Sequence, residues 1–501
     1  MIKPKILLVS PASIFDPKDP FTTGVVYMPI GLAYGAAALK RADFNVHVFD
    51  LFGQEPKRVE RVGSFVRLGA SDADLLKEID RIQPDLVLFY ANQLLNHTAL
   101  IQSIKTIRTT HPYLIMGVAE NTQAVTSYLL KEVSEEFFNE GVNFLISGEM
   151  ENVVVQIASN IFHRLDVALW KIAGVSLSKN DNFRSSIIQN LDELANPAWE
   201  LFPIENYWKL GFSHGPLTSD KYFPILTSRG CPFPCKFCVV PSTNNRKWRF
   251  RTAINVVDEI EKFAEEFGVK EFHLEDLNPT IQDNRMQQIA TEIIARGLDV
   301  NWKIVAGTKI ESIKSLETLR LMKRSGLSYL SMSPESGSKR VLRDIGKPFD
   351  VQHALTMIRE SYRIGIKTQT CFVLGYPTEK FSDRVKSFFL VMRLTIAGAD
   401  EIVVFIMTPV PGSDVYRSFA GQFDSLSSLS FSPRWRIDFK PLLIWRLLYY
   451  STFLILKFVR NPLKMICQLF NMKSGRFETK MEMTPVRGFK YLLLSKGLSK
   501  K

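Results

Sequence analysis

Short apolar runs alternate with amphipathic stretches along the first 150 residues of the chain. The runs KILLVS, NVHVFDL, DLVLFY, YLIMGV and NFLISGE are rich in Val, Ile, Leu and Phe, and stretches with helical spacing such as GLAYGAAALKRA and DADLLKEIDRI separate them. This rhythm is typical of a doubly wound parallel sheet that is buried on both faces. We therefore predict an N-terminal Rossmann-like α/β domain over residues 1–150, with ligands at the carboxyl ends of its strands.

A second series of strands follows an interruption. Residues 151–222 contain NPAWELFPIENYW, which is rich in Pro and Trp, and they predict a linker. From residue 223 the runs FPILTS, EFHLED, NWKIVAG, YLSMSPE, KTQTCFVLG and EIVVFIMTP restore the alternation. Six strands with intervening helices predict a partial (β/α)6 barrel of the TIM type over residues 223–420, because a full barrel has eight.

The remaining residues, 421–501, fall outside the alternation and predict a helical C-terminal region that is both basic and hydrophobic. Residues 441–470 form one apolar and aromatic stretch, which Lys and Arg residues interrupt, so it does not resemble an ordinary transmembrane helix. Its aromatic residues beside cations are Trp445, Tyr449, Tyr450 and Phe453. They suit an interfacial helix at an anionic membrane, and a lid on the barrel mouth is the alternative.

The charge distribution narrows the choice of partners. The 501 residues carry a formal net charge of +12, and residues 434–501 hold 15 Lys and Arg against 3 Asp and Glu, so the whole excess lies there. A nucleic-acid-binding protein with a basic core would not show this pattern, and we predict no nucleic-acid partner. The tail points to a lipid surface or an anionic substrate. Five cysteines form no disulfide framework, and no signal peptide precedes KILLVS, so we expect a cytoplasmic protein.

Three of the cysteines lie together in GCPFPCKFC, directly after the run FPILTS. Cys231, Cys235 and Cys238 have the spacing C-x3-C-x2-C, and the two prolines keep the loop out of helix and ladder pairing. A structural zinc site needs four closed ligands, and the nearest further candidate is His214. A [4Fe–4S] cluster with three thiolate ligands leaves one iron open, which is a catalytic arrangement. We predict that the three cysteines are the metal ligands and the catalytic centre.

This spacing, with Phe237 directly before the last cysteine, resembles the radical SAM superfamily. The resemblance implies that the open iron chelates S-adenosyl-L-methionine (SAM). It also implies that one electron from an external flavodoxin- or ferredoxin-type donor cleaves SAM to a 5′-deoxyadenosyl radical.

Further segments resemble the SAM-binding motifs of the same superfamily. LEDLNP is placed like the motif for the SAM amino group, and SPESGSKRVL like the motif for the ribose and carboxylate. FVLGYPTEK resembles the segment near the adenine, and TPVPGSDVY resembles a segment that ends the barrel. The residues that these motifs implicate in SAM binding are Glu275, Asp276, Glu335, Ser336, Arg340 and Gly375.

The N-terminal half resembles the cobalamin (B12)-binding domain that precedes the barrel in class B radical SAM enzymes, through MPIGLAYGAAALKRADFNVHVFD and NFLISGEMEN. The resemblance implies cobalamin contacts at Gly117, Glu120, Gly148 and Glu149. Two departures are present: Glu120 stands where relatives carry a histidine, and Met150 replaces the second glycine of a G-E-G-E turn. The motif D-x-H-x-x-G is missing from the sequence, so we expect no histidine ligand to cobalt.

The domain order and the cysteine loop together predict a cobalamin-dependent radical SAM methyltransferase. We expect C-methylation of an unactivated carbon of a hydrophobic small molecule, such as a lipid or a tetrapyrrole. A non-methylating reaction such as an oxidative cyclisation is the alternative within the superfamily. A cobalamin-binding sensor with a vestigial barrel is the alternative from another class, and the intact cysteine triad argues against it.

Overall fold

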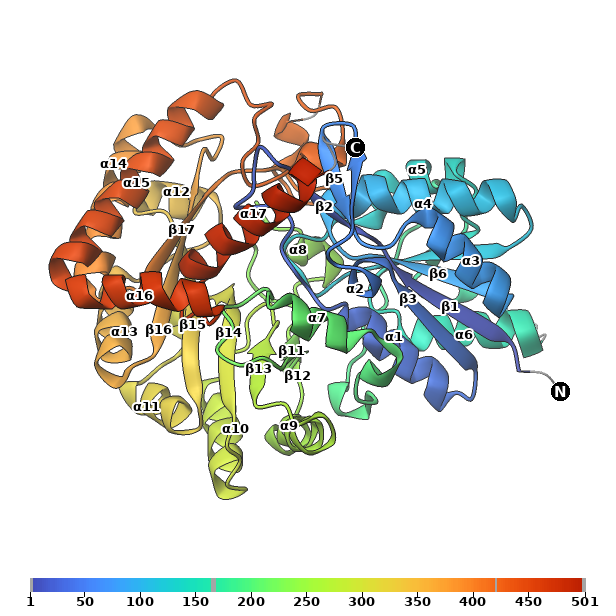
Figure 1. Cartoon of the computed structure of the whole chain (residues 1–501), viewed down its shortest axis with the longest axis horizontal. Helices are drawn as coiled ribbons and strands as arrows, with labels where there is room; N and C mark the ends of the chain where they lie inside the picture. The colour runs from blue at the N-terminus through green and yellow to red at the C-terminus, as the bar shows by residue number, and fades with distance from the viewer. Residues whose placement is uncertain (1–2, 164–167, 420, 498–501) are drawn as a thin grey trace.

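Two six-stranded sheets side by side dominate the chain, and helices cover their outer faces (Figure 1). The computed structural model describes residues 3–163, 168–419 and 421–497. The predicted domain boundary at residue 420 and the last four residues of the basic tail lie outside this range. The predicted α/β class with parallel sheets and a helical C-terminal region is confirmed.

The N-terminal sheet contains all five strands that the apolar runs predict. In spatial order its strands are β3 (Asn45–Asp50), β1 (Lys5–Ser10), β6 (Leu86–Ala91), β7 (Ile115–Glu120), β8 (Phe144–Ile146) and β9 (Val175–Ser176). All neighbours run parallel except β8 and β9, which are antiparallel. The surrounding helices are α1 (Ile30–Arg41), α2 (Leu51–Gln54), α3 (Asp72–Ile82), α4 (His97–Thr110), α5 (Ser134–Asn139) and α6 (Glu151–His163). Because α6 packs on α1, this unit includes residues beyond 150.

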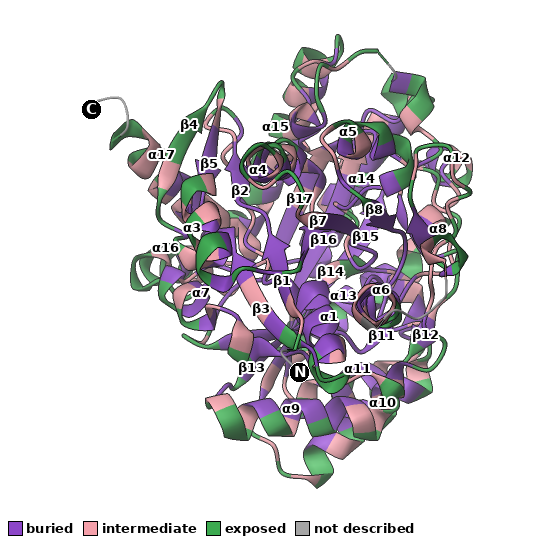
Figure 2. Cartoon of the chain, turned by 90° about the vertical axis from the view of Figure 1, so that its right-hand side faces the viewer, coloured by how far each residue is buried: buried purple, intermediate pink, exposed green. Residues whose placement is uncertain are grey.

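The second sheet is parallel throughout and contains the six strands expected after residue 223. In spatial order they are β10 (Tyr222–Ile225), β13 (Glu271–Leu274), β14 (Asn301–Thr308), β15 (Leu327–Glu335), β16 (Lys367–Leu374) and β17 (Glu401–Ile406). The helices between and before them are α7 (Ile204–Leu210), α8 (Val240–Thr243), α9 (Ala253–Phe267), α10 (Asp283–Ala295), α11 (Leu316–Arg324), α12 (Lys339–Asp344), α13 (Val351–Ile364) and α14 (Phe381–Ala397). Figure 2 shows that the strands of both sheets are buried, while the outer faces of the helices are exposed.

Two small antiparallel sheets have no counterpart in the sequence prediction. One contains β2 (Ser13–Phe15), β5 (Phe65–Leu68) and β4 (Val59–Val62), and the other pairs β11 (Ser228–Arg229) with β12 (Arg249–Phe250). These strands have two to four residues each. Such segments are too short to show a clear alternation of apolar and polar positions.

The apolar stretch of residues 441–470 forms two helices rather than one. Helix α15 (Phe439–Arg460) ends before Pro462, which begins α16 (Pro462–Ser474). Proline lacks the N–H that a continuing helix requires, and it fits the first turn of a new one. A third helix, α17 (Lys480–Gly497), contacts both β4 and β17, so it bridges the two halves of the chain (Figure 1).

The orientation of α15 corrects one prediction. Tyr449 and Phe453, which we expected at a membrane interface, are fully buried together with Leu442. The positions differ by seven and four residues, so they share one face of the helix, and this face packs on α14 and β17. The aromatic character of this stretch therefore serves internal packing. The opposite face of α15 is exposed and mainly aliphatic, and it also carries Phe458.

Candidate active site

A two-stranded ribbon positions the cysteine loop. Strand β11 ends at Arg229, and Gly230 follows with φ of +79°. A Cβ atom at Gly230 would lie 2.0 Å from the carbonyl oxygen of Lys247, so only glycine fits this turn. The loop then curls, and the N–H of Cys238 donates to the carbonyl of Cys235 at 3.1 Å. The short helix α8 follows at once, so the loop is held at both ends.

Cys231, Cys235 and Cys238 line one cavity of about 240 Å³, which we call the cysteine cavity. All three are free thiols. Burial raises the pKa of Cys235 to about 11 and that of Cys238 to about 12. Buried thiols of this kind become thiolates when a positive centre is bound between them.

Two lysines and a glutamate face the same cavity. Burial alone would lower the pKa of Lys347, but nearby negative groups raise it instead, first Glu335 and then Cys235. The Glu335 carboxylate accepts a hydrogen bond from Nζ of Lys347 at 2.6 Å. Lys309 also lines the cavity, and its ammonium lies 5.1 Å from the ring centroid of Phe233. Positive charges beside three thiols favour a group with net negative charge. Glu335 itself has φ of +61°, a strained conformation for a residue with a side chain.

The cysteines fit an iron–sulfur cluster better than a zinc ion. Among the residues that the structure describes, no group of three or more Cys, His, Asp or Glu side chains is arranged to hold a single metal ion. A mononuclear zinc site requires its sulfur atoms about 2.3 Å from one point. In a [4Fe–4S] cluster each thiolate binds a different iron, so the ligands stand farther apart. The cavity, the three thiols and the neighbouring cations are all compatible with a cluster.

Two of the residues expected to contact SAM or the cluster line the cysteine cavity, namely Phe237 and Glu335. The ring of Phe237 packs edge-on against Tyr376 at 5.6 Å. The buried Cys371 of β16 lies in the wall of the same cavity. Its thiol contacts Gln369 Oε1 at 3.5 Å.

Three other expected SAM residues, Asp276, Ser336 and Arg340, have protein partners and do not line this cavity. The Asp276 carboxylate accepts hydrogen bonds from the N–H and hydroxyl of Thr227, so it holds the strand end before the cysteine loop. Ser336 contacts Ser387 at 3.1 Å. Arg340 donates to Asp383 and to the carbonyl of Thr378. These contacts indicate that the side chains hold the strand-end loops in place.

Gly375 follows β16 with φ of +85° and borders the C-terminal region. A Cβ atom there would lie 2.7 Å from Leu442 of α15, and its carbonyl accepts a hydrogen bond from Arg436 at 2.9 Å. The glycine therefore permits the close approach of α15 to the strand end. Its predicted place beside the adenine stays a prediction.

Glu275 lies on the other side of β13, toward the N-terminal domain. Its Oε2 lies 2.7 Å from Nδ1 of His214, and the His214 ring packs on Tyr27 at 4.6 Å. Burial lowers the pKa of His214, although Glu275 opposes the shift. The pair lines a cavity of about 60 Å³ between the two sheets, which we call the edge cavity.

The residues expected to contact cobalamin connect loops instead of lining the edge cavity. Glu120 ends β7 and accepts the N–H groups of Leu130 at 2.9 Å and Gly148 at 2.8 Å. Gly117 lies within β7, where a Cβ atom would lie 2.2 Å from the Phe144 ring. Both positions therefore serve packing and loop geometry in the structure.

Gly148 and Glu149 face the second domain. A Cβ atom at Gly148 would lie 2.3 Å from the carbonyl of Ser186, so the turn is packed against the connecting segment. The Glu149 carboxylate receives Arg249 of β12 at 2.8 Å and the N–H of Ile188 at 2.6 Å. This turn is an interdomain contact.

Amide side chains surround the edge cavity at the carboxyl ends of β6 and β7. They are Asn92, Gln93, Asn121 and Gln123. The Oε1 atom of Gln123 is buried and lacks a hydrogen-bond partner. A corrin carries amide side chains on its rim, so donors and acceptors of this kind fit it. The 60 Å³ of this cavity alone are too small for a corrin, whereas the joined cavities offer more space.

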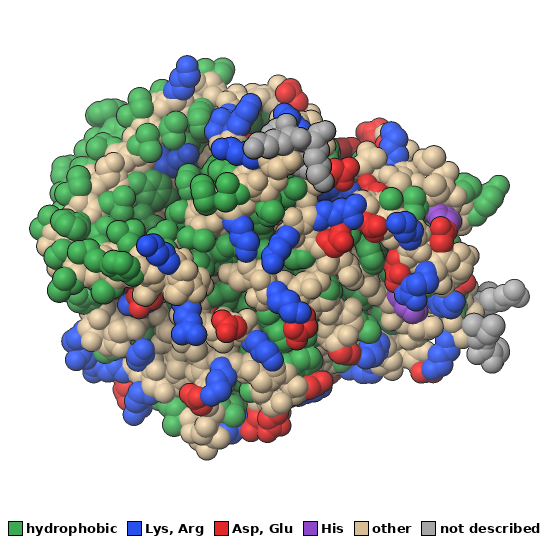
Figure 3. Space-filling view, viewed as in Figure 1, with side chains coloured by type: hydrophobic (Ala, Val, Ile, Leu, Met, Phe, Trp, Pro, Cys, Tyr) green, Lys and Arg blue, Asp and Glu red, His purple; other side chains and the backbone are tan. Residues whose placement is uncertain are grey.

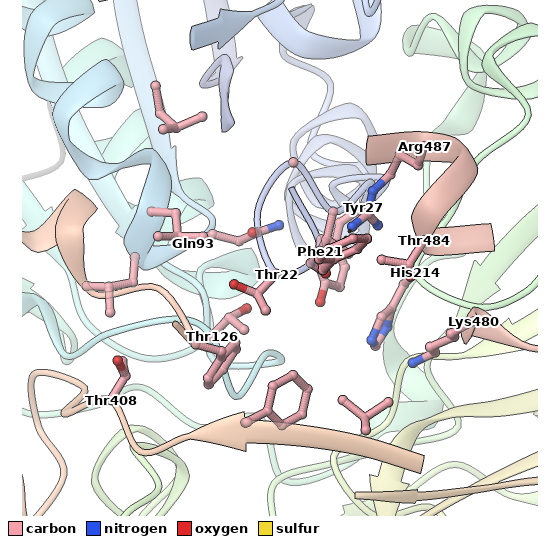
Figure 4. Close-up of a pocket in the computed structure, with 18 of the residues that line it drawn as sticks. Phe21, Thr22, Tyr27, Gln93, Thr126, His214, Thr408, Lys480, Thr484 and Arg487 are labelled. Atoms are coloured by element: carbon pink, nitrogen blue, oxygen red, sulfur yellow. Dashed lines mark hydrogen bonds between the residues drawn. The ribbon is translucent and has the colours of Figure 1, made fainter. Parts of the chain in front are cut away.

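Three cavities meet at the centre of the molecule. Tyr27, Thr126 and His214 line the cysteine cavity, the edge cavity and a third cavity of about 140 Å³ beneath α17, which we call the α17 cavity. Figure 4 shows Tyr27 and His214 pointing into the α17 cavity, with Lys480 beside His214. The carboxyl ends of both sheets therefore face three adjoining cavities.

The sequence carries no local signal for several of these residues. Lys309, Lys347 and His214 come from separate loops, and Lys480 and Arg487 come from the last helix. Only the fold brings them together. The one available hint is the excess of cations after residue 434, which predicts an anion but not its place.

Comparison with known proteins agrees with this geometry. Residues 225–391 match the family model of the radical SAM superfamily. The chain is 24% identical over 437 residues to an uncharacterized methyltransferase of Pyrococcus horikoshii, covering 86% of this chain and 85% of the relative. It is 25% identical over 445 residues to the cytidylyl-2-hydroxyethylphosphonate methyltransferase of Streptomyces wedmorensis, covering 82% of this chain and 81% of the relative.

Among solved structures, the cobalamin-dependent S-adenosylmethionine radical enzyme OxsB, with aqua-cobalamin and S-adenosylmethionine bound, superposes with a TM-score of 0.62 at 15% identity. The match covers 90% of this chain and 56% of that chain, and it concerns the fold. The order of a Rossmann-like sheet followed by the cysteine-bearing sheet is thus shared along most of the chain. Residues 225–391 therefore form a radical SAM domain, and most of the chain shares its fold with the cobalamin-dependent radical enzyme OxsB.

Proposed function

We propose that this protein is a cobalamin-dependent radical SAM methyltransferase that methylates a carbon atom of a small molecule. The observation that carries the proposal is the shared interior. Three thiols on the second sheet and the amide-rich edge of the first sheet open onto the same set of cavities. When bound, the cluster and SAM supply radical chemistry, and cobalamin supplies a methyl group.

The chain's own residues bind and position these groups. Cys231, Cys235 and Cys238 hold the cluster, and Lys347 and Lys309 balance its negative charge. The edge amides hold the corrin between the sheets, where burial excludes water from reactive species. We propose further that the second sheet curves into a partial barrel around the cysteine cavity. An electron donor of the flavodoxin or ferredoxin type completes the system.

The test replaces one cluster ligand and compares it with a cysteine elsewhere. Cys235→Ala should lose iron and sulfide after anaerobic reconstitution, and it should form no 5′-deoxyadenosine from SAM with a chemical reductant. The exposed Cys467 on α16 provides the matched control. Cys467→Ala should retain its iron and sulfide and should still form 5′-deoxyadenosine, because Cys467 lies outside the cysteine cavity.

Methyl transfer is measured separately with SAM that carries a deuterated methyl group, using a metabolite extract as the substrate source. A labelled product should appear together with 5′-deoxyadenosine and S-adenosylhomocysteine. If 5′-deoxyadenosine forms without S-adenosylhomocysteine, the methyl transfer is refuted and a cyclisation remains. If Cys235→Ala still cleaves SAM, the cluster assignment itself is refuted.

We also propose that the outer faces of α14, α15 and α16 contact the cytoplasmic surface of an anionic membrane. Helix α15 is long and apolar enough to cross a membrane by length and composition, and only 22% of its most apolar window is buried in the protein. Figure 3 shows hydrophobic side chains gathered over this part of the surface. The exposed apolar residues include Phe381, Phe389, Ile396, Ile444, Leu447, Ile455, Phe458, Val459, Leu463, Leu469 and Phe470. A monomeric soluble protein rarely exposes so continuous an apolar area.

The cations on this surface decide how the contact is made. Lys457 and Arg460, which interrupt the apolar stretch in the sequence, turn inward and donate to the carbonyls of Asp400 at 2.7 Å and Thr395 at 3.1 Å. Arg393, Lys440 and Lys473 stay exposed on the same helices. An apolar face edged by exposed cations suits anionic headgroups, and α15 then lies on the membrane instead of crossing it.

A further inference from the structure

The α17 cavity is apolar on one wall and cationic on the other. Val403, Phe405, Leu429 and Phe431 line the wall beside β17. Helix α17 lines the opposite wall with Lys480, Met483, Thr484 and Arg487. Their spacing of three, four and seven residues places them on one face of the helix. The cavity also shares Tyr27, His214 and Lys480 with the cysteine cavity.

Arg487 is a buried cation with incomplete hydrogen bonding. Its side chain is 2% exposed, and its Nε atom has no hydrogen-bond partner. Among the residues that the structure describes, the guanidinium donates to the carbonyls of Phe21 at 3.5 Å and Thr23 at 3.4 Å alone, and both bonds are long. Figure 4 shows the side chain extending from α17 toward Phe21 and Tyr27.

No carboxylate forms an ion pair with Arg487 in the part of the chain that the structure describes. Asp19, which accepts the hydroxyl of Thr22, acts on Arg487 through its charge from beyond ion-pair distance. A buried guanidinium without a counter-ion is costly, and proteins retain such groups where a ligand supplies the charge. The partner that Arg487 is missing is therefore an anion.

Lys480 repeats the pattern at the junction with the cysteine cavity. Its Nζ atom donates to the carbonyl of Val305 at 2.8 Å, and within the described ranges it has no carboxylate partner at ion-pair distance. The ammonium retains two further donors in this position. Lys480 and Arg487 lie two turns apart on the same face of α17, so both can attract an anionic group to this wall.

We propose that the α17 cavity binds the anionic end of the substrate, a carboxylate or a phosphate, through Arg487 and Lys480, while an apolar body extends toward the cysteine cavity. This assignment rests on the proposed function, because it takes the joined cavities as the substrate site. It adds the chemical class of the substrate: an amphiphile with one acidic end. Arginine suits this role since its planar fork pairs with two oxygens of a carboxylate or phosphate.

The test measures binding without turnover. Dodecyl phosphate, dodecanoate and dodecanol, all below their micelle concentrations, are titrated into reconstituted full-length enzyme by calorimetry. We expect the anionic probes to bind at least about tenfold more tightly than dodecanol, as a charge-assisted contact would give. The stronger of the two anions identifies the acidic group. Arg487→Met should lose this preference and Arg487→Lys should retain part of it.

The matched control is Lys490→Met on the same helix. Lys490 lies over the Phe212 ring and donates to the carbonyl of Leu210, away from the cavity. This variant should bind the anions like the wild type. Adsorption of probes on the exposed face of α15 would be equal in all variants and would not imitate the expected result.

Two outcomes overturn the proposal. One is equal affinity of the wild type for dodecanol and for the anions. The other is unchanged anion binding by Arg487→Met, in preparations where Arg487→Met and Arg487→Lys both keep their iron content and fold. Failure of the proposed function has a different signature. In that case the wild type forms no 5′-deoxyadenosine, whatever the probes show. The two results are read from separate measurements on the same preparation.

Discussion

Glu120 shows how one side chain can occupy a motif position and have a different task. Sequence comparison with cobalamin-binding domains places a histidine there, and we predicted a cofactor contact. In the structure its two oxygens accept the N–H groups of Leu130 and Gly148, which belong to different loops. A carboxylate can accept from both donors at once, whereas a neutral imidazole offers one acceptor. The residue therefore fixes the turn after β8.

This arrangement predicts a pH dependence. Burial raises the pKa of Glu120 from 4.5 to about 7, although both backbone hydrogen bonds lower it. Between pH 4.5 and 7 the folded chain keeps this proton and the unfolded chain releases it, so the neutral carboxyl stabilises the fold fully below pH 4.5 and less as the pH rises to 7. Glu120→Gln stays neutral throughout. As the pH rises from 4.5 to 7, the unfolding free energy of the wild type should therefore fall by about 3 kcal/mol relative to that of Glu120→Gln.

Urea unfolding of both proteins across this pH range measures the shift. The exposed Glu132→Gln serves as the control and should follow the wild type at every pH. Cobalamin content after reconstitution should be unchanged in Glu120→Gln if the side chain only connects loops. Parallel stability curves for wild type and Glu120→Gln would contradict the assigned protonation.

The residues that sequence analysis could identify are those whose signal is local. Cys231, Cys235 and Cys238 stand within eight positions, and their spacing alone indicates an iron–sulfur ligand set. Lys480 and Arg487 lie about 250 residues further on, and nothing in their surroundings distinguishes them from solvated cations. Their burial results from the docking of α17 across both halves, which no local pattern encodes.

At the scale of the elements, strands buried on both faces were predictable and partly exposed elements were not. All eleven apolar runs form strands, because continuous burial leaves an uninterrupted apolar signal. For α15 the sequence shows two faces that are both apolar, one richer in aromatic and the other richer in aliphatic residues. Hydrophobicity alone cannot tell which of them packs on the protein, and we assigned the aromatic face to the membrane, which was wrong.

The exposed aliphatic face of α15 gives the prediction at this scale. Replacing Ile455 and Val459 by glutamate puts two charges on residues that are 63% and 75% exposed. Flotation with vesicles of phosphatidylcholine and phosphatidylglycerol should show salt-sensitive binding of the wild type. Binding by the double variant should fall at least about tenfold, because two apolar side chains no longer enter the interface.

Tyr113→Glu is the control, since Tyr113 is 95% exposed on the N-terminal domain, away from α15. It should bind vesicles like the wild type. Two results would refute the membrane contact. One is a wild-type protein that stays unbound at low salt, and the other is a stable dimer that the double variant dissociates, which would mean that a second copy covers this face.

At the scale of the whole molecule, ion pairs connect the N-terminal domain to the ribbon that begins the cysteine loop. Arg249 of β12 contacts both oxygens of Glu149 at 2.9 and 2.8 Å, and Arg229 of β11 contacts Glu151 at 2.6 Å. All four side chains are at least nine-tenths buried. The N-terminal domain thus contacts the ribbon that supports the cluster loop, and we expect a change on one side of this contact to affect the other side.

Arg249→Met tests this connection, because it removes the two short contacts of the buried Glu149 carboxylate and leaves it Arg229, whose Nη1 lies 3.7 Å away. The unfolding free energy should fall by about 3 kcal/mol, the lower end of the loss for broken buried pairs, because Arg229 still compensates part of the charge. The double variant Glu149→Gln with Arg249→Met should lose less than the single one, since the partly compensated carboxylate is gone. Lys270→Met removes a cation from an exposed pair with Asp299 and should cost less than about 1 kcal/mol. Iron content should fall in Arg249→Met although the variant retains all three cysteines. If iron content is unchanged and the unfolding free energy falls no more than in Lys270→Met, the ion pair does not hold the loop.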